Sequence, residues 1–283
     1  MDPKARFLVA LLAGIAGAVA PAPAPAAERD YRHATNTAGD LRFTARYLNL
    51  DGDLLSIAFT LPQRALRESA REFGYSPDET RRMAKRCRCT QSEYDRRVEA
   101  YYRSRLLKWD KTSGRRILRV DVPAVVKRNA LRLSPLAREF ERLAAARGDG
   151  RDATIDTVVT FVQSGLDYRL LPSREGGREI LGFYDPLRAL QAGAGDCDSK
   201  AALLAAILMN IRGTRMIGVD VGRHYLVGIA RKPRRGDASI QYRGQSFVLI
   251  EPSGPARLPP GTIHRRTQAA LDATKQVRID PLF

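Results

Sequence analysis

Histidine, cysteine and tryptophan are scarce: the chain has three histidines, three cysteines and one tryptophan among 283 residues. Structural zinc sites take about four cysteine or histidine ligands, and no segment gathers that many. Regularly spaced acids typical of a calcium-binding loop are also missing. The sequence therefore predicts neither a bound metal nor a cofactor.

Acidic residues are in short supply, with 31 of them against 48 lysines and arginines and a net charge of +17. Such an excess favours anionic partners such as lipid headgroups, cell-wall polymers or nucleic acid. A solvated, arginine-rich surface is the plainer interpretation. Because no basic stretch carries interleaved aromatics and no helix-turn-helix pattern is found, nucleic acid is not a predicted partner.

Long apolar runs are missing except near the start of the chain. Residues 7–20 are apolar, follow Lys4 and Arg6, and precede alternating alanine and proline with small residues around Ala26. This pattern predicts a signal peptide over residues 1–27. The run is shorter than the roughly 20 residues that span a bilayer, so an uncleaved anchor is the weaker alternative. We expect a periplasmic or secreted mature chain without a transmembrane segment.

The three cysteines form an odd set. Cys87 and Cys89 are separated by one residue, and Cys197 stands alone. An odd count in an exported chain indicates a free reactive thiol or an intermolecular bridge. A disulfide across one intervening residue is strained, so the pairing of Cys87 with Cys89 stays open.

Residues 28–150 form an N-terminal region of hairpin and helices. Alternating residues predict strands at 41–48 and 54–61 around a turn at 49–52. One helix is expected to begin at Pro62 and a second at Ser76. Two further helices are expected over residues 91–109 and 135–146, and a strand is expected between them at 115–122. The polar stretch 148–152 is the expected boundary. No chemistry is assigned to this region, which is either an accessory domain docked on the site or a pro-region removed on activation.

Residues 151–283 form the second expected domain, with an α+β pattern. A helix at 153–164 is followed by a polar loop at 173–178 and a short helix before Gln191. After a longer apolar helix, strands are expected at 214–220, 224–230 and 240–250 as antiparallel hairpins. Residues 255–283 show little periodicity and are expected to form a strap.

The domain is organised around residues 191–209. Gly193 and Gly195 permit a tight turn, and Asp196 is a good helix N-cap, so Cys197 opens a helix that should end near 211. Because residues 201–209 are apolar, that helix should be buried all round. The helix dipole favours a thiolate, whereas the carboxylates of Asp196 and Asp198 oppose it.

A cysteine nucleophile needs an imidazole to take its proton and a third group to orient that imidazole. His224 begins a predicted strand and Glu251 ends a later one, whereas His33 and His264 lie outside the strands expected beside the cysteine helix. The predicted triad is Cys197, His224 and Glu251. The alternatives are a buried structural cysteine and a solvated surface glutamate.

Residues from about 155 to 255 resemble the transglutaminase-like superfamily, whose members have a papain-like core. The similar stretches are Gly-Asp-Cys-Asp-Ser-Lys-Ala at 195–201, the helix after it, the histidine at a strand start, and Phe-Val-Leu-Ile-Glu-Pro-Ser at 247–253. The resemblance implies Cys197 as nucleophile, His224 as general base and then acid, and Glu251 as its orienting partner. The family usually has aspartate in place of Glu251 and often a second acid in place of Ser199.

The resemblance also implies an activity: an exported cysteine hydrolase or acyltransferase that cleaves an amide or peptide bond through a thioester. Its substrate would be a peptide or protein, with the cell envelope as one source. The backbone N–H of Cys197 would stabilise the oxyanion. Gln191 is similar to the glutamine of papain-like peptidases and is a second candidate donor, with a solvent-facing glutamine as the alternative. The rival function is a binding module that keeps the fold without turnover and docks on envelope polymers or a partner protein.

Overall fold

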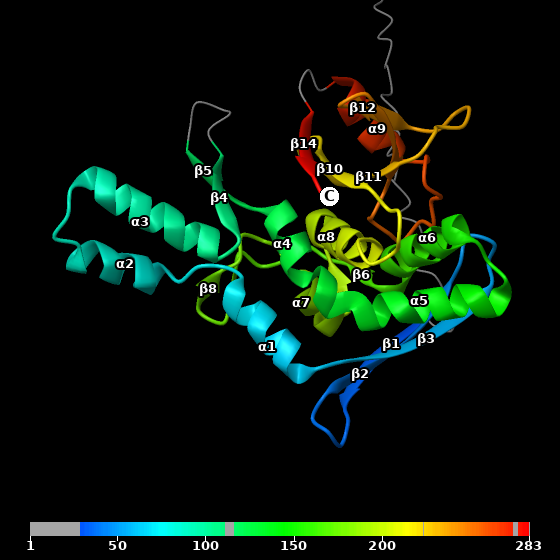
Figure 1. Ribbon diagram of the computed structural model, residues 1–283, viewed down its shortest axis with the longest axis horizontal. Coiled ribbons are helices and arrows are strands. Elements are labelled where there is room, and N and C mark those ends of the chain that lie inside the picture. Colours follow the sequence, from blue (N-terminus) through cyan, green and yellow to red (C-terminus); the bar gives the residue numbers. More distant parts are fainter. Residues whose placement is uncertain (1–28, 111–115, 223, 274–276, 283) are drawn as a thin grey trace, which may run out of the picture.

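A computed structural model describes residues 29–110, 116–222, 224–273 and 277–282. The predicted signal peptide at 1–27 lies outside these residues. The protein is a mixed α and β structure, in which helices pack between a small N-terminal sheet and a larger C-terminal one (Figure 1). Within the described part of the chain, no helix is both long enough and apolar enough to cross a membrane.

The N-terminal sheet has three antiparallel strands, β1 (Asp30–Thr35), β2 (Leu41–Leu48) and β3 (Leu54–Leu61). Alternate residues of β2 are buried, as the apolar alternation requires for a sheet with one covered face. Gly52 in the connecting turn has φ +88°, which favours glycine. The strands predicted at 41–48 and 54–61 are confirmed.

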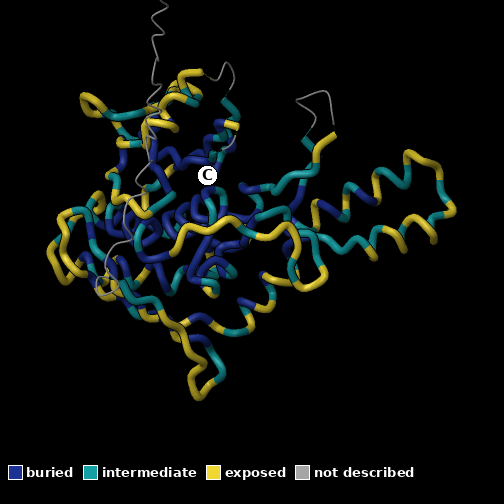
Figure 2. Tube along the Cα trace, turned by 180° about the vertical axis from the view of Figure 1, so that it is seen from behind, coloured by how far each residue is buried: buried dark blue, intermediate teal, exposed yellow. Residues whose placement is uncertain are grey.

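Five helices follow along the N-terminal region: α1 (Gln63–Glu72), α2 (Pro77–Arg86), α3 (Gln91–Ser104), α4 (Val122–Ala130) and α5 (Ser134–Arg147). Ser76 caps α2 and Thr90 forms a capping box on α3, which explains where both begin. A 3₁₀ turn at Leu131–Leu133 links α4 to α5. Figure 2 shows the α2–α3 pair projecting from the body, with mostly exposed and half-buried residues.

The helix predicted over 91–109 is too long. The chain reverses at Leu106, whose φ is +59°, and β4 (Leu107–Asp110) then pairs with β5 (Ile117–Val120). Trp109 therefore belongs to a strand, where its ring packs edge-on against Tyr102. The predicted strand at 115–122 is shorter than expected, because Asp121 caps α4.

The central helices are α6 (Arg151–Thr160), which continues into a π-helical turn at Phe161–Gly165, α7 (Pro186–Ala192) and α8 (Cys197–Leu208). All residues of α8 are buried except the half-buried Asp198, which confirms the prediction of a helix buried all round. The helix ends at Leu208, three residues before the predicted position. Its neighbours include α4, α7 and β11 (Tyr225–Ala230).

The C-terminal sheet is antiparallel, with strand order β12-β13-β11-β10-β14. The strand predicted at 240–250 is a hairpin of β12 (Ser239–Tyr242) and β13 (Gln245–Ile250). Its tight turn runs through Arg243 and Gly244, which both have positive φ. The expected strap contains helix α9 (Arg265–Ala273) and edge strand β14 (Arg278–Pro281), which pairs with β10 (Met216–Asp220).

Two short strand pairs complete the fold. β6 (Asp167–Tyr168) runs parallel to β9 (Ala194–Gly195), so that Tyr168 lies beside the loop before Cys197. β7 (Arg174–Glu175) and β8 (Arg178–Glu179) form a small hairpin. Gly193 has φ +60° and ends α7, whereas Gly195 is extended within β9, so only the first of the two predicted turn glycines has positive φ.

One hydrophobic cluster joins the N-terminal region to the rest of the protein. It includes Phe43 of β2, Phe140 of α5, Leu204 of α8 and Val227 of β11. A second cluster on the other face of the large sheet packs against α9. The proposed boundary at 148–152 therefore does not separate two hydrophobic cores, and the division into domains stays a prediction.

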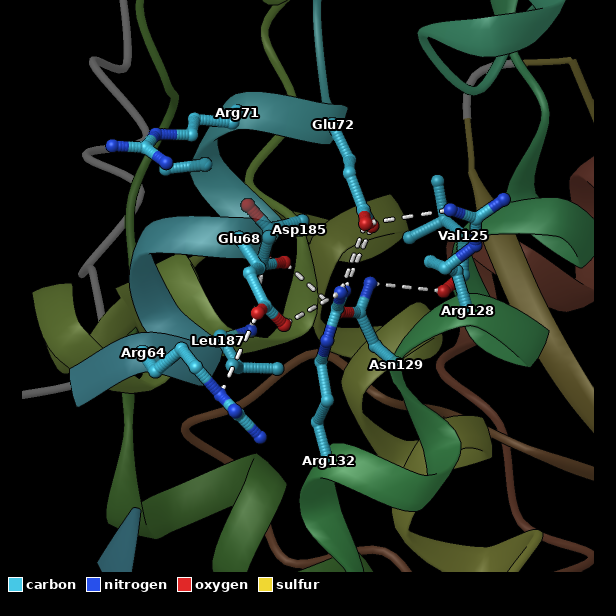
Figure 3. A network of polar contacts seen from close by, with 12 residues as sticks. Arg64, Glu68, Arg71, Glu72, Val125, Arg128, Asn129, Arg132, Asp185 and Leu187 are labelled. Atoms are coloured by element: carbon cyan, nitrogen blue, oxygen red, sulfur yellow. Dashed lines mark hydrogen bonds and ion pairs between the residues drawn. The ribbon is translucent and has the colours of Figure 1, made fainter. Parts of the chain in front are cut away.

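A buried polar network also ties the N-terminal region to α7 (Figure 3). The hydroxyl of Ser69 on α1 donates to the carboxylate of Asp185, the residue that caps α7. Arg132 pairs with Glu72 at 2.9 Å and donates to Asn129 at 3.1 Å. The helix that leads into the cysteine loop is thus held by residues far back in the chain.

Candidate active site

Cys197 is the first residue of α8. Asp196 caps the helix, because its Oδ1 accepts a hydrogen bond of 3.1 Å from the Ser199 amide. The hydroxyl of Ser199 in turn accepts from the amide of Tyr184 at 2.9 Å. These bonds fix the sulfur at a helix start with 9% of the residue exposed.

His224 and Glu251 lie at adjacent ends of neighbouring strands. His224 directly precedes β11 and Glu251 directly follows β13, and Val227 is paired with Ile250 across the two strands. His224 Nε2 lies 2.6 Å from Glu251 Oε1. The glutamate side chain is 4% exposed and the imidazole 21%, so Glu251 is buried while His224 is accessible to solvent.

The carboxylate of Glu251 has further partners. The Thr267 hydroxyl on α9 donates to Oε2 at 3.0 Å, and the Ser253 amide donates to Oε1 at 3.4 Å. Burial raises the pKa of Glu251, but the hydrogen bond and charge of His224, with these donors, outweigh burial and leave the pKa below its usual value. An ionised Glu251 accepts the proton on Nε2, which leaves the Nδ1 lone pair of His224 as the acceptor.

The surroundings of the Cys197 thiol favour its neutral form. Its Sγ donates to Asp198 Oδ1 at 3.1 Å. Burial raises the pKa of the thiol well above its usual value, and the nearby carboxylates of Asp198 and Asp196 raise it further, against a smaller opposing effect of the Tyr225 amide. Among the described residues, none of the thiol's hydrogen bonds goes to His224. Thiolate formation at neutral pH therefore needs a base.

A cavity of about 460 Å³ brings Cys197 and His224 together. Glu251 lines a neighbouring cavity of about 590 Å³, which shares His224 and Tyr168 with the first. The three predicted triad residues therefore converge on one region of the protein. Whether they act in catalysis stays a prediction.

Gln191 is not brought to this cavity. It is exposed on α7 and lines a separate hollow with Glu175 and Arg188. Its backbone oxygen lies 2.9 Å from His33 Nε2, which places that histidine away from the cysteine as well. The role of Gln191 as an oxyanion donor stays a prediction that this arrangement does not support.

Sequence reasoning missed the residues behind the pair. Gln163, fully buried in the π-helical turn, donates from Nε2 to the backbone oxygens of Glu251 at 2.7 Å and Leu258 at 3.0 Å. Lys200, one turn beyond Cys197, donates from Nζ to the backbone oxygen of Gln163 at 3.2 Å. Burial lowers the pKa of Lys200 to about 7. A charged residue in an apolar helix is a visible signal for Lys200, but nothing local marks Gln163.

The remaining candidate ligands are dispersed. Over the residues that the structure describes, no group of three or more histidine, cysteine, aspartate and glutamate side chains is placed to hold a metal ion. Cys87 and Cys89 are joined by a disulfide, and Cys197 is a free thiol. Cys197 is thus the thiol available for chemistry in this region.

No protein-family model, curated protein or solved structure matches this chain.

Proposed function

We propose that this protein is a transglutaminase-like cysteine hydrolase or acyltransferase with a papain-like core. The proposal combines a buried helix that presents Cys197 with an antiparallel sheet that presents His224 and Glu251. The observation that carries it is the 2.6 Å contact between His224 and Glu251, made by an imidazole that lines the same cavity as the thiol. A cysteine, an imidazole and an orienting acid are the parts that nucleophilic acyl transfer requires.

In the proposed reaction, His224 Nδ1 takes the proton of the Cys197 thiol as the sulfur attacks an amide carbonyl. The imidazolium, stabilised by Glu251, then gives that proton to the leaving amine, and a thioester remains on the sulfur. Water or a second amine attacks the thioester with the same general base, and the thiol is restored. The amide of Cys197 lies at a helix start, where free N–H groups can stabilise the oxyanion.

The raised pKa of the thiol fits a general-base mechanism rather than a preformed ion pair. The thiol donates to Asp198, and burial together with that carboxylate raises the pKa of the sulfur. Transfer to His224 requires the thiol to turn away from Asp198, and the positive imidazolium then stabilises the thiolate beside it. Substrate entry that displaces solvent from the cavity would strengthen this attraction.

The second candidate function is a binding module of the same fold without turnover. The hydrogen bond from the thiol to Asp198 favours it, because that bond stabilises an unreactive neutral sulfur. The net charge of +17 would then serve to dock the protein on an anionic polymer or partner. Export, proposed from the signal peptide, is compatible with either function.

Alkylation of Cys197 by iodoacetamide separates the two candidates. We expect His224→Ala to slow alkylation at pH 7 by roughly tenfold or more, because general-base assistance is worth roughly 10²–10⁴-fold. His264→Ala is the matched control, since His264 is exposed and does not line the cavity of Cys197. Equal rates in the two variants would favour the binding module.

A further inference from the structure

Large apolar side chains that remain exposed are few, and most of them gather at one place. Those in the described part of the chain are Leu54, Ile117, Leu131, Tyr168 and Leu170. Three of these five, Ile117, Tyr168 and Leu170, line the cavity that holds Cys197. Single exposed apolar residues need no explanation, but their concentration at one concave site marks an interaction surface.

The exposed apolar residues of this cavity come from two segments, and Val122, Leu181, Phe183 and Tyr225 also line it. Strand β5 contributes Ile117, Leu118 and Val120, and the segment after the π-helical turn contributes Tyr168 and Leu170. Leu170 is 80% exposed and Ile117 is 38% exposed, so both offer apolar surface that a ligand would cover. Covering such surface is favourable in proportion to the area removed from water.

The charged lining of the cavity disfavours an anionic ligand beside the sulfur. Two arginines among the described lining residues form ion pairs: Arg278 pairs with Asp220 at 2.6 Å, and Arg119 pairs with Asp110 at 2.7 Å. Asp196 and Asp198, which flank Cys197, form no ion pair with a basic side chain among the residues described. A substrate carboxylate there would meet like charge, and the described residues that line the cavity provide no free cation to neutralise it.

The size of the cavity limits its occupant. About 460 Å³ accommodates a small molecule or a few residues of an extended peptide, within the range of ordinary ligand pockets. Because the candidate nucleophile lies in the same cavity, that occupant would present its carbonyl to Cys197 and a side chain to the exposed apolar residues. Strand β5 also gives the N-terminal region a role, since it supplies part of the apolar lining.

We infer that the cavity selects extended peptide substrates that carry a leucine- or phenylalanine-like side chain next to the reacting carbonyl. Leu170, Tyr168 and Ile117 are the specificity-determining residues. This inference rests on the proposed function, because it assumes that Cys197 attacks the carbonyl of the peptide. The preference for an apolar side chain can also be measured as peptide affinity, without any reaction.

The first test compares peptide amides that share a fluorogenic leaving group and differ only in the residue that supplies the carbonyl: leucine, serine or aspartate. We expect kcat/KM to be highest for leucine and lowest for aspartate. Leu170→Ser should lower kcat/KM for the leucine substrate by roughly tenfold, as expected for one lost apolar contact in a pocket, and should change the serine substrate little. Leu131→Ser is the matched control, because Leu131 is 83% exposed and lies outside the cavity.

A second measurement separates this inference from the proposed reaction. Fluorescein-labelled peptides with the same three residues are bound to the Cys197→Ala protein and followed by fluorescence anisotropy. Leucine-selective binding that Leu170→Ser weakens supports the inference even if the wild-type protein turns nothing over, in which case the proposed reaction fails alone. Turnover or binding without preference for leucine, or an equal response to Leu131→Ser, would overturn the inference.

Discussion

Neighbouring groups shift the pKa of the Cys197 thiol in opposite directions. The Tyr225 amide and the start of α8 favour a thiolate, whereas burial and the charges of Asp198 and Asp196 favour the thiol. The net effect is a raised pKa, with burial as the largest cause and the two flanking acids adding to it. A neutral resting thiol is less exposed to adventitious alkylation and oxidation, because the thiolate is the reactive form.

Removing the charge of Asp198 should make the sulfur more reactive. Asp198 raises the pKa of Cys197, so Asp198→Asn lowers that pKa and increases the thiolate fraction at pH 7. We expect alkylation by iodoacetamide to become roughly three- to tenfold faster, since each pKa unit changes the thiolate fraction about tenfold. Asp152→Asn, at an exposed position, is the charge-matched control. An unchanged or slower rate in Asp198→Asn would show that Asp198 does not hold the thiol neutral.

The raised pKa of Asp156 predicts that the free energy of unfolding changes with pH. Burial raises the pKa of its carboxyl from 3.8 to about 6, and its Oδ1 is buried without a hydrogen-bond partner in the described structure. The folded state thus holds this proton more tightly than the unfolded state, and the resulting stability, fully present below pH 3.8, is lost as the pH rises through about 6.

Asp156→Asn avoids that loss. We expect a gain of about 1–2 kcal/mol in the free energy of unfolding at pH 7.5, after allowance for partial exposure of the carboxyl. The gain should shrink as the pH falls from about 6 towards 4. Urea titrations across this range measure it, and a gain independent of pH would contradict the explanation.

Among the elements, the π-helical turn at Phe161–Gly165 links the cysteine helix to the acid. Lys200 Nζ on α8 donates to the backbone oxygen of Gln163, and the side-chain amide of Gln163 donates to the backbone oxygen of Glu251. Gly254 packs against the same turn so closely that a Cβ there would lie 1.7 Å from the Gln163 oxygen. This turn therefore positions the backbone from which Glu251 reaches His224.

Gln163→Leu should destabilise the protein and misplace Glu251. It removes three hydrogen bonds, one to the buried backbone oxygen of Glu251 and two with partly buried backbone groups of Leu258. We expect a loss of about 2–4 kcal/mol in the free energy of unfolding, since each unsatisfied buried group costs about 1–3 kcal/mol. Gln191→Leu, the same change at an exposed position, should alter the stability by less than about 0.5 kcal/mol. Comparable losses in urea titrations of both variants would exclude this role.

The elements that were predictable are those whose pattern is local. Strands β2 and β3 alternate strictly, and α8 combines an aspartate cap with an uninterrupted apolar run. Helix α3 was extended too far because Trp109 continues the aromatic spacing of Tyr102, and no local signal marks the reversal at Leu106. Helix α9 has a single buried residue, Thr267, so its sequence shows little apolar periodicity.

The positions of the candidate site residues were predictable to the same extent. Cys197, His224 and Glu251 each stand at the end of an element with a clear pattern, and the structure brings them to one region. The contacts of Thr267 and Gln163 with Glu251 span 16 and 88 residues of sequence. Such partners are set by the packing of whole elements, which spacing along the chain does not reveal.

At the scale of the whole molecule, the N-terminal region packs against the elements that carry the candidate active site. It shares the main hydrophobic cluster, contacts Asp185, the N-cap of α7, through Ser69, and lines the cysteine cavity through β5. An arrangement of this kind favours a region that stays in place over a pro-region that is removed on activation.

A chain limited to residues 151–283 should therefore fail to fold cooperatively. It would lose the partners of fully buried side chains on α8, and burial of each large apolar side chain is worth about 1.5–3 kcal/mol against a total stability of about 5–15 kcal/mol. Near-ultraviolet circular dichroism and urea titration, with residues 29–283 as the reference, measure this. A cooperative transition in the shorter chain would show that the N-terminal region is dispensable for folding.

The most direct test of the central claim is to trap the acyl group on the sulfur. Wild-type protein is mixed with the p-nitrophenyl ester of acetyl-leucine, quenched in acid and analysed by intact and peptide mass spectrometry. The proposed mechanism predicts one acetyl-leucyl adduct on Cys197 that neutral hydroxylamine removes, and a slower rate of formation, by roughly 100-fold or more, in His224→Ala. No adduct on Cys197, or one formed equally fast without His224, would contradict the mechanism.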